Sequence, residues 1–123
     1  MENSYLFVYG TLKRGHGNNA LIRHTEFIAE AISVDKFDVS GYSFPCAYPN
    51  NDGKLLQGEI YKLTEEDFIS TDSLEGNGHF YNREIRRFVY MGKIIEAWIY
   101  IIISPASNTY KTDSDIINWC YKY

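Results

Sequence analysis

A glutamate at the predicted end of a helix is the first residue in a position to do acid–base chemistry. Glu75 lies in the stretch Leu74-Glu75-Gly76, and a glycine directly after a helical segment is typical of a helix C-terminus. The unsatisfied carbonyls at a helix end disfavour a further negative charge, and apolar neighbours such as Leu74 and Phe80 add desolvation. Both effects raise the pKa of a carboxyl group towards neutrality, as a general acid or base requires. A solvated glutamate before a capping glycine fits the same pattern.

A turn that contains glycine follows an apolar strand near the N-terminus and is the second candidate. Residues 5–17 read YLFVYGTLKRGHG, and the spacing from Gly10 to Gly15 is that of the first half of a phosphate-binding loop. His16 and Gly17 stand where that loop needs a lysine and a hydroxyl residue, so a nucleotide site is not expected. The small residue at Gly10 allows backbone N–H groups to form a concave nest for an anion or an oxyanion. An ordinary strand-ending turn explains the same glycine.

The remaining polar residues give weaker candidates. The three histidines share no helical spacing with a carboxylate or a thiol, so we expect no metal site. No serine stands in a G-x-S-x-G turn, and Cys46 has no indicated histidine partner, so a small buried thiol is the better interpretation. We interpret Asp72 as part of the polar face of its helix. We interpret Arg83, Arg86 and Arg87 as solvated charges on strand faces, one of which could pair with a substrate carboxylate.

The composition is typical of one globular domain, and we assign residues 1–123 to it. Hydrophobic residues make up 45% and charged residues 23% of the 123-residue chain. The net charge of −4 and the scattered basic residues argue against a nucleic-acid partner. The longest apolar run, Ala97–Ile103, is too short to cross a bilayer, so no membrane partner is expected. The N-terminus shows no signal peptide, which predicts a cytoplasmic protein with two reduced cysteines.

The hydrophobic pattern predicts more strand than helix. Alternating or continuous apolar segments predict strands, and these cover residues 5–9, 27–37, 55–63, 81–90 and 93–103. Capping residues and acidic first turns predict helices at 18–24, 64–75 and 113–121. Residues 41–52 are rich in Gly, Pro and Asn and read as a loop. Sequential hairpins outnumber β-α-β units, so the expected fold is α+β with a small curved sheet or barrel.

Several motifs, taken together, resemble a known family. They are FVYGTLKRG at residues 7–15, GEIYKLTEEDF at 58–68, and DSLEG at 72–76 followed by Tyr81 and Arg83. The combination is similar to the γ-glutamylcyclotransferase-like family, and more narrowly to its branch of γ-glutamylamine cyclotransferase and AIG2-like proteins. The resemblance covers about residues 5–100. It implies a compact mixed β-barrel with a few short flanking helices, and an enzyme that uses neither a metal nor a cofactor.

The resemblance also implies a reaction and a set of site residues. Members of the family cleave a γ-glutamyl amide of a small molecule by letting its α-amine attack the γ-carbonyl, which gives 5-oxoproline and a free amine or amino acid. By alignment, Glu75 is the expected catalytic acid and base. The expected substrate-binding residues are Tyr9, Gly10, Thr11, Leu12 and Tyr81. If these assignments hold, Glu75 and the turn must face one cavity.

Two departures from the family pattern accompany this resemblance. Thr71-Asp72 stands where the family commonly has Leu-Asp, and the segment from Gly41 to Pro45 only loosely matches a family loop that shapes the leaving-group side. Besides an active cyclotransferase, a non-catalytic member that binds a small ligand or a protein is therefore an open alternative. Removal of a γ-glutamyl protecting group from a biosynthetic intermediate is a related enzymatic alternative. The glutamate at position 75 favours an active enzyme.

Overall fold

An apolar strand with both faces buried lies at the centre of the fold. The computed structural model describes residues 4–41, 45–105 and 111–119. Strand β1, Tyr5–Val8, pairs antiparallel with β4, Lys54–Lys62, and parallel with β6, Lys93–Ile102. Because successive side chains of a strand point to opposite faces, Phe7 enters one core cluster while its neighbours in β1 enter another. The strand predicted at residues 5–9 is therefore confirmed, including its burial on both faces.

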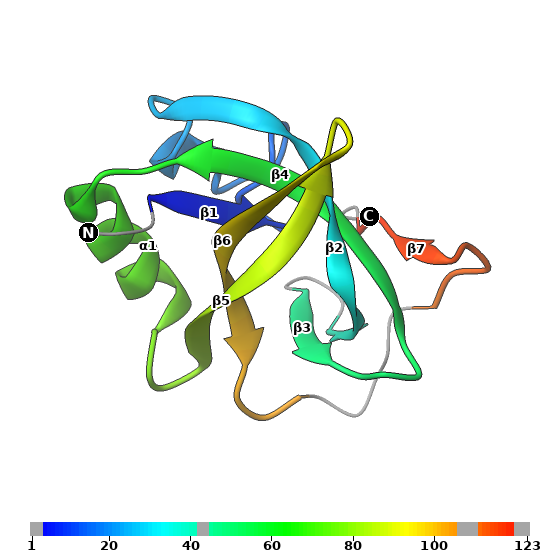
Figure 1. The fold of residues 1–123 in the computed structure, drawn as a ribbon. Coiled ribbons are helices and arrows are strands. Elements are labelled where there is room, and N and C mark those ends of the chain that lie inside the picture. The colour runs from blue at the N-terminus through cyan, green and yellow to red at the C-terminus, as the bar shows by residue number, and fades with distance from the viewer. Residues whose placement is uncertain (1–3, 42–44, 106–110, 120–123) are drawn as a thin grey trace.

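Five strands close into a mixed barrel (Figure 1). Strand β2, Glu26–Ser40, pairs with β4 on one side and with β5, Tyr81–Tyr90, on the other. Strands β5 and β6 form a hairpin, and β6 leads back through β1 to β4, which completes the circle. Two short strands extend the sheet: β3, Cys46–Pro49, lies beside β2, and β7, Ile116–Ile117, lies beside β4. The expected barrel-like α+β fold is confirmed.

Two apolar clusters stabilise this arrangement. The larger cluster draws residues from all seven strands and lies inside the barrel, where the rings of Phe7 and Phe88 stack with centroids 4.0 Å apart. The smaller cluster lies between β1, β4 and β6 on one side and the helices on the other, and it contains the helical residue Phe68. One core therefore fills the interior of the barrel, and the other lies between the outer wall of the barrel and the helix. This second core holds the helix against the barrel wall.

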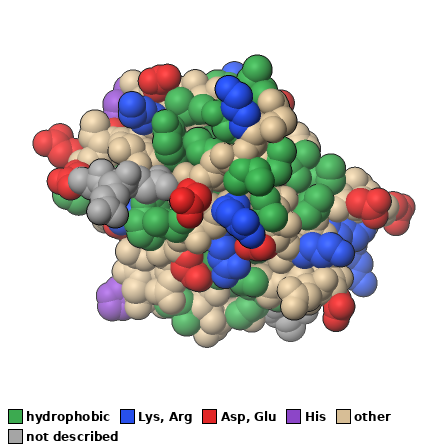
Figure 2. All heavy atoms as spheres, in the orientation of Figure 1, with side chains coloured by type: hydrophobic (Ala, Val, Ile, Leu, Met, Phe, Trp, Pro, Cys, Tyr) green, Lys and Arg blue, Asp and Glu red, His purple; other side chains and the backbone are tan. Residues whose placement is uncertain are grey.

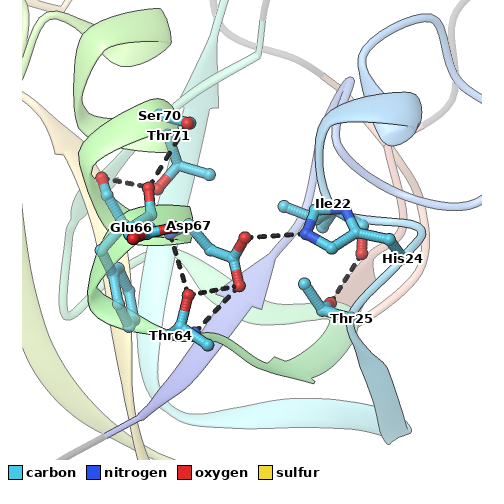
Figure 3. Close-up of polar contacts among 9 residues, drawn as sticks. Ile22, His24, Thr25, Thr64, Glu66, Asp67, Ser70 and Thr71 are labelled. Atoms are coloured by element: carbon cyan, nitrogen blue, oxygen red, sulfur yellow. Dashed lines mark hydrogen bonds and ion pairs between the residues drawn. The ribbon is translucent and has the colours of Figure 1, made fainter.

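Helix α1, Glu65–Glu75, has clear signals at both ends. At its start, the Thr64 hydroxyl accepts a hydrogen bond from the Asp67 amide while the Asp67 carboxylate accepts one from the Thr64 amide. The same carboxylate lies 2.7 Å from the His24 ring, which ties the helix to the turn that precedes β2 (Figure 3). At its end, Gly76 adopts a left-handed conformation with φ of 61°. The helix predicted at 64–75 is confirmed.

Three local predictions are wrong. Residues 113–121 do not form a helix where they are described; Ile116 and Ile117 instead pair with β4 as a parallel strand, and residues 120 and 121 lie outside the described residues. The predicted loop at 41–52 contains strand β3. The predicted helix at 18–24 is only a short 3-10 helix, Asn19–Leu21, because the Asn18 side chain donates to Thr11 and does not cap it. In each case a tertiary partner outweighs the local pattern.

The surface shows mixed charge on the face drawn in Figure 2. Lys and Arg side chains on that face are interspersed with Asp and Glu, and hydrophobic side chains lie between them. In the described parts of the chain, no helix is long and apolar enough to cross a bilayer. That nucleic acid is not a partner stays a prediction.

Candidate active site

The predicted site residues lie around one pocket. A cavity of about 40 Å³ is lined by the turn that contains Gly10 and by Glu75 and Tyr81. The turn comes from the end of β1, Glu75 from the end of α1, and Tyr81 from the start of β5. Within the described part of the chain, the lining residues are Phe7, Val8, Tyr9, Gly10, Thr11, Leu12, Pro45, Glu75, Tyr81 and Tyr100. Segments more than sixty residues apart in the sequence are thus brought together, and their roles in catalysis remain predictions.

The turn after β1 is shaped by a close approach to Pro45. A Cβ atom on Gly10 would overlap the Cγ atom of Pro45, so the absence of a side chain is a steric requirement here. The Lys13 amide donates to the Gly10 carbonyl at 3.0 Å, and the Asn18 amide donates to the Thr11 carbonyl at 3.0 Å. Among the described residues, the amides of residues 10–12 have no acceptor within the protein. The turn therefore has donors left for a ligand, as expected for an anion-binding nest.

The cations that follow the turn have other partners. Lys13 is only 7% exposed, and its ammonium donates to the Asn118 side chain at 3.2 Å and to a backbone carbonyl. The Arg14 amide and guanidinium both donate to the Glu59 carboxylate, at 2.9 and 3.4 Å. Neither residue lines the pocket that contains Glu75. Neutral backbone amides are thus the donors that this segment brings to the pocket.

Glu75 brings to this pocket a carboxyl group that has no partner among the described residues. Gly76 ends the helix directly after it by donating to the carbonyls of Asp72 and Ser73, which sets the direction of the last helical turn. No hydrogen bond or ion pair to the Glu75 carboxylate is found in the described part of the chain. Desolvation by burial raises the pKa of Glu75 from 4.5 to about 7. The group can therefore exchange a proton near neutral pH.

The cause of this shift differs in part from the expected one. Burial in the pocket accounts for the raised pKa of Glu75, and the helix end is not needed to explain it. Leu74 and Phe80 flank Glu75 but stay 44% and 69% exposed, so they account for only part of its desolvation. The pocket walls supply the remainder. A carboxyl group without a neighbouring cation in such a place is costly to ionise.

The two predicted tyrosines differ in what their hydroxyl groups do. The Tyr9 hydroxyl donates to the Tyr100 carbonyl at 2.8 Å and accepts from the Ala47 amide at 3.1 Å, so it connects β6 to β3. In the described part of the chain, the Tyr81 hydroxyl has two contacts, a long one of 3.4 Å to the Pro45 carbonyl and one of 3.3 Å to the Cys46 sulfur. Burial raises the pKa of both phenols well above their usual range, which keeps them neutral. Tyr9 is thus a structural wall of the pocket, whereas Tyr81 has a hydroxyl that can turn towards a ligand.

An ionic network behind the pocket was missed by the sequence analysis. The Tyr100 hydroxyl donates to the Asp72 carboxylate at 2.6 Å, and Arg83 donates to both oxygens of Asp72 at 2.9 and 3.2 Å. The Arg83 guanidinium also lies over the rings of Phe68 and Trp98, 4.4 Å from each centroid. Arg83 is therefore not a solvated charge, and Asp72 is more than a polar helix face. The network ties the last turn of α1 to β5 and β6.

Pro45 and Tyr100 line the pocket, but no pattern in the sequence identified them as site residues. The obligatory glycine at position 10 was an indirect sign that another segment approaches closely, but nothing identified Pro45 as that segment. Tyr100 lies in a strand with several tyrosines and aliphatic residues nearby, and only its contact with Asp72 distinguishes it. Cys46 is half-buried beside Tyr81, so the expectation of a buried thiol is met only in part. In the described ranges, no group of three or more His, Cys, Asp or Glu residues is placed to hold a metal ion.

Comparison with known proteins agrees with the geometry. A family model described as gamma-glutamyl cyclotransferase, AIG2-like, matches residues 6–120. The chain belongs to this family. Its relatives include a provisionally named gamma-glutamylcyclotransferase of Methanocaldococcus jannaschii, 31% identical over 98 residues that cover 78% of this chain and 82% of that protein. The human gamma-glutamylaminecyclotransferase is 29% identical over 91 residues, which cover 67% of this chain and 60% of the human one.

The fold of this family member is also that of a solved structure. The crystal structure of a mouse AIG2-like protein superimposes with a TM-score of 0.77 at 25% sequence identity, and the match covers 85% of this chain and 80% of the mouse chain. The match therefore shows that the two chains share this fold over most of their length. The predicted family resemblance is confirmed.

Proposed function

We propose that this protein is a cyclotransferase that cleaves a γ-glutamyl amide to 5-oxoproline and a free amine. The observation that carries the proposal is the placement of Glu75. This carboxyl group has a pKa raised to about 7 and no partner among the described residues, and it shares a small pocket with the turn of residues 10–12. A proton acceptor and a set of neutral N–H donors are what an intramolecular acyl transfer needs.

The reaction begins with the substrate folded upon itself. The Glu75 carboxylate takes a proton from the α-ammonium group of the substrate, and the freed amine attacks the γ-carbonyl carbon to form the new C–N bond of a five-membered ring. The oxygen of that carbonyl becomes negative and is stabilised by N–H donors of the turn. Because nucleophile and carbonyl belong to one molecule, the protein mainly holds a productive conformation and moves protons.

Collapse of the intermediate completes the proton balance. The bond between the γ-carbonyl carbon and the leaving nitrogen breaks as that nitrogen receives a proton from Glu75. Overall the α-nitrogen loses two protons and the leaving nitrogen gains two, so one carboxyl group can relay both. A pKa of about 7 suits this role, because both protonation states of Glu75 are then populated near neutral pH. We assign to the Tyr81 hydroxyl, which contacts the Pro45 carbonyl and the Cys46 sulfur, the role of orienting the substrate.

A comparison of two helix variants tests the proposal. Purified protein is incubated with γ-glutamyl amides of several amines and amino acids, and 5-oxoproline is measured by mass spectrometry. We expect Glu75→Gln to reduce kcat/KM by at least a factor of about 1,000, since it removes the proton relay. Glu66→Gln is the matched control, because Glu66 is exposed in the first turn of the same helix and lies away from the pocket.

Three results would contradict the proposal in different ways. Full activity of Glu75→Gln would remove Glu75 from the mechanism. Absence of 5-oxoproline with every amide, together with tight binding of those amides, would instead support the alternative of a non-catalytic small-ligand binder. Equal losses in both variants would indicate damage to α1 and not loss of a catalytic group.

A further inference from the structure

An apolar groove lies directly outside the pocket. It has a volume of about 480 Å³ and shares Thr11, Glu75 and Tyr81 with the inner pocket. Its other lining residues among those that the structure describes are Asn18, Cys46, Leu74, Phe80 and Ile102. In the proposed reaction the glutamyl group occupies the inner pocket, so the leaving amine of the substrate extends along this groove. The chemistry of the groove therefore bears on the choice of leaving group.

Phe80 is held as an exposed wall of the groove. Its amide donates to the Gly76 carbonyl at 2.9 Å, and its carbonyl accepts from the Ile103 amide at 2.9 Å. A Cβ atom on Gly76 would lie 2.6 Å from the Phe80 ring, so the ring packs on the glycine that ends α1. Despite these restraints, the side chain remains 69% exposed. An aromatic ring fixed in solvent beside a pocket is available to cover an apolar ligand.

The scarcity of charged side chains in the described lining of the groove favours a neutral ligand. Among the described lining residues there is no Lys, Arg or His, and the carboxyl group of Glu75 is the one acidic side chain. A carboxylate on the leaving group would have no cation to pair with in this lining and would approach Glu75. An additional ammonium group on the leaving chain would lose hydration against Leu74 and Phe80. An uncharged chain gains instead from burying apolar surface.

From these contacts we propose that the groove selects γ-glutamyl amides whose leaving amine carries a neutral, apolar chain, such as an alkylamine or an arylalkylamine. This inference rests on the proposed cyclotransferase reaction and specifies its substrate class. Phe80 and Leu74 are the specificity-determining residues, and they act by contact with the leaving chain. The amide of an amino acid is a poor substrate for the same reason.

A homologous series of substrates tests the inference. The series contains the γ-glutamyl amides of methylamine, propylamine, pentylamine and hexylamine, with the amides of 6-aminohexanoate and cadaverine as charged counterparts of similar length. We expect kcat/KM to rise about three- to fourfold for each methylene that enters the groove. We expect at least a tenfold lower kcat/KM for the two charged counterparts than for hexylamine.

Variants assign the selectivity to the groove. Phe80→Ala is expected to reduce the ratio of hexylamide to methylamide activity at least fivefold. Phe80→Lys is expected to favour the 6-aminohexanoate amide over the hexylamide. Ile69→Ala is the matched control, because Ile69 is also 69% exposed but lies outside the groove on α1. We expect this control to leave every ratio unchanged.

A binding measurement separates this inference from the proposed reaction. Calorimetry with the methylamide and the hexylamide is carried out on Glu75→Gln and on the double variant with Phe80→Ala. Tighter binding of the hexylamide that is lost with Phe80→Ala supports the groove, even if the wild-type protein releases no 5-oxoproline. Turnover with equal kcat/KM along the whole series leaves the cyclotransferase proposal intact and overturns the inference. If the protein shows no turnover and no selective binding, both the cyclotransferase proposal and this inference are overturned.

Discussion

Replacement of Glu75 by glutamine should stabilise the protein at high pH, although it removes the proposed proton relay. A carboxyl group whose pKa rises from 4.5 when unfolded to about 7 when folded binds its proton more tightly in the folded state. The folded state is then favoured at low pH, and this contribution to stability is lost as the pH rises from about 4.5 to about 7. Glutamine has the shape of the protonated glutamate and does not ionise, so the variant escapes the loss.

The magnitude follows from the two pKa values of Glu75. Ionising a group whose pKa is displaced from 4.5 to about 7 costs the folded state about 3 kcal/mol. Because the pocket is open to solvent, part of this cost is screened, and we expect a gain of between about 1 and 3 kcal/mol for Glu75→Gln at pH 8. At pH 4.5 the expected difference between variant and wild type is less than about 1 kcal/mol, since both side chains are then largely neutral in the folded protein.

Urea unfolding of both proteins at pH 4.5, 6, 7 and 8 measures this difference. Titration of all other groups affects both proteins alike and cancels when the free energies of unfolding are subtracted. Glu66→Gln, at an exposed position of the same helix, provides the control and should show a difference that does not change with pH. A Glu75→Gln protein that is equally or less stable than wild type at pH 8 would refute the assignment of Glu75 as a desolvated, unpaired carboxyl group.

Two further predictions concern the walls of the pocket. Gly10→Ala should lower the free energy of unfolding by about 1 to 3 kcal/mol, measured by urea unfolding, because the added Cβ atom overlaps Pro45. The same variant should lower kcat/KM at least tenfold. A Gly10→Ala protein with normal stability and activity would show that the turn is less confined. Tyr9→Phe should lower the free energy of unfolding by about 1 to 3 kcal/mol, because the Ala47 amide and the Tyr100 carbonyl lose their shared partner. Its hydrogen exchange at Ala47 should accelerate, and unchanged exchange there would contradict the predicted connection.

Local signals in the sequence were sufficient for elements that are defined by their own residues. Helix α1 spans eleven residues, with its N-cap Thr64 directly before them and its C-cap Gly76 directly after, so its start and end could be read directly. The β5–β6 hairpin joins its two strands at Met91 and Gly92, and its register follows from that short turn. Strand β1 was recognisable because its residues are apolar on both faces.

Elements that depend on a distant partner could not be read in this way. Ile116 and Ile117 become a strand because Leu55 and Leu56 of β4 are available for pairing, about sixty residues earlier in the chain. Strand β3 likewise forms along β2 within a segment whose composition is typical of a loop. The closure of the barrel rests on β2, which pairs with β4 and with β5 along different parts of its length. A sequence pattern indicates that a strand forms, but not which strand it meets.

For the candidate site, the sequence by itself determined the chemical groups and their local setting: a carboxyl group at a helix end and a glycine turn after a strand. The tertiary structure decided that these two lie on one pocket, that no cation reaches Glu75 among the described residues, and that Pro45 requires the glycine at position 10. It also decided that Arg83 is committed to Asp72 behind the pocket. The physical reason is that capping and hydrophobic periodicity act between residues close in sequence. Desolvation and steric contact depend on whichever segments the closed barrel brings together.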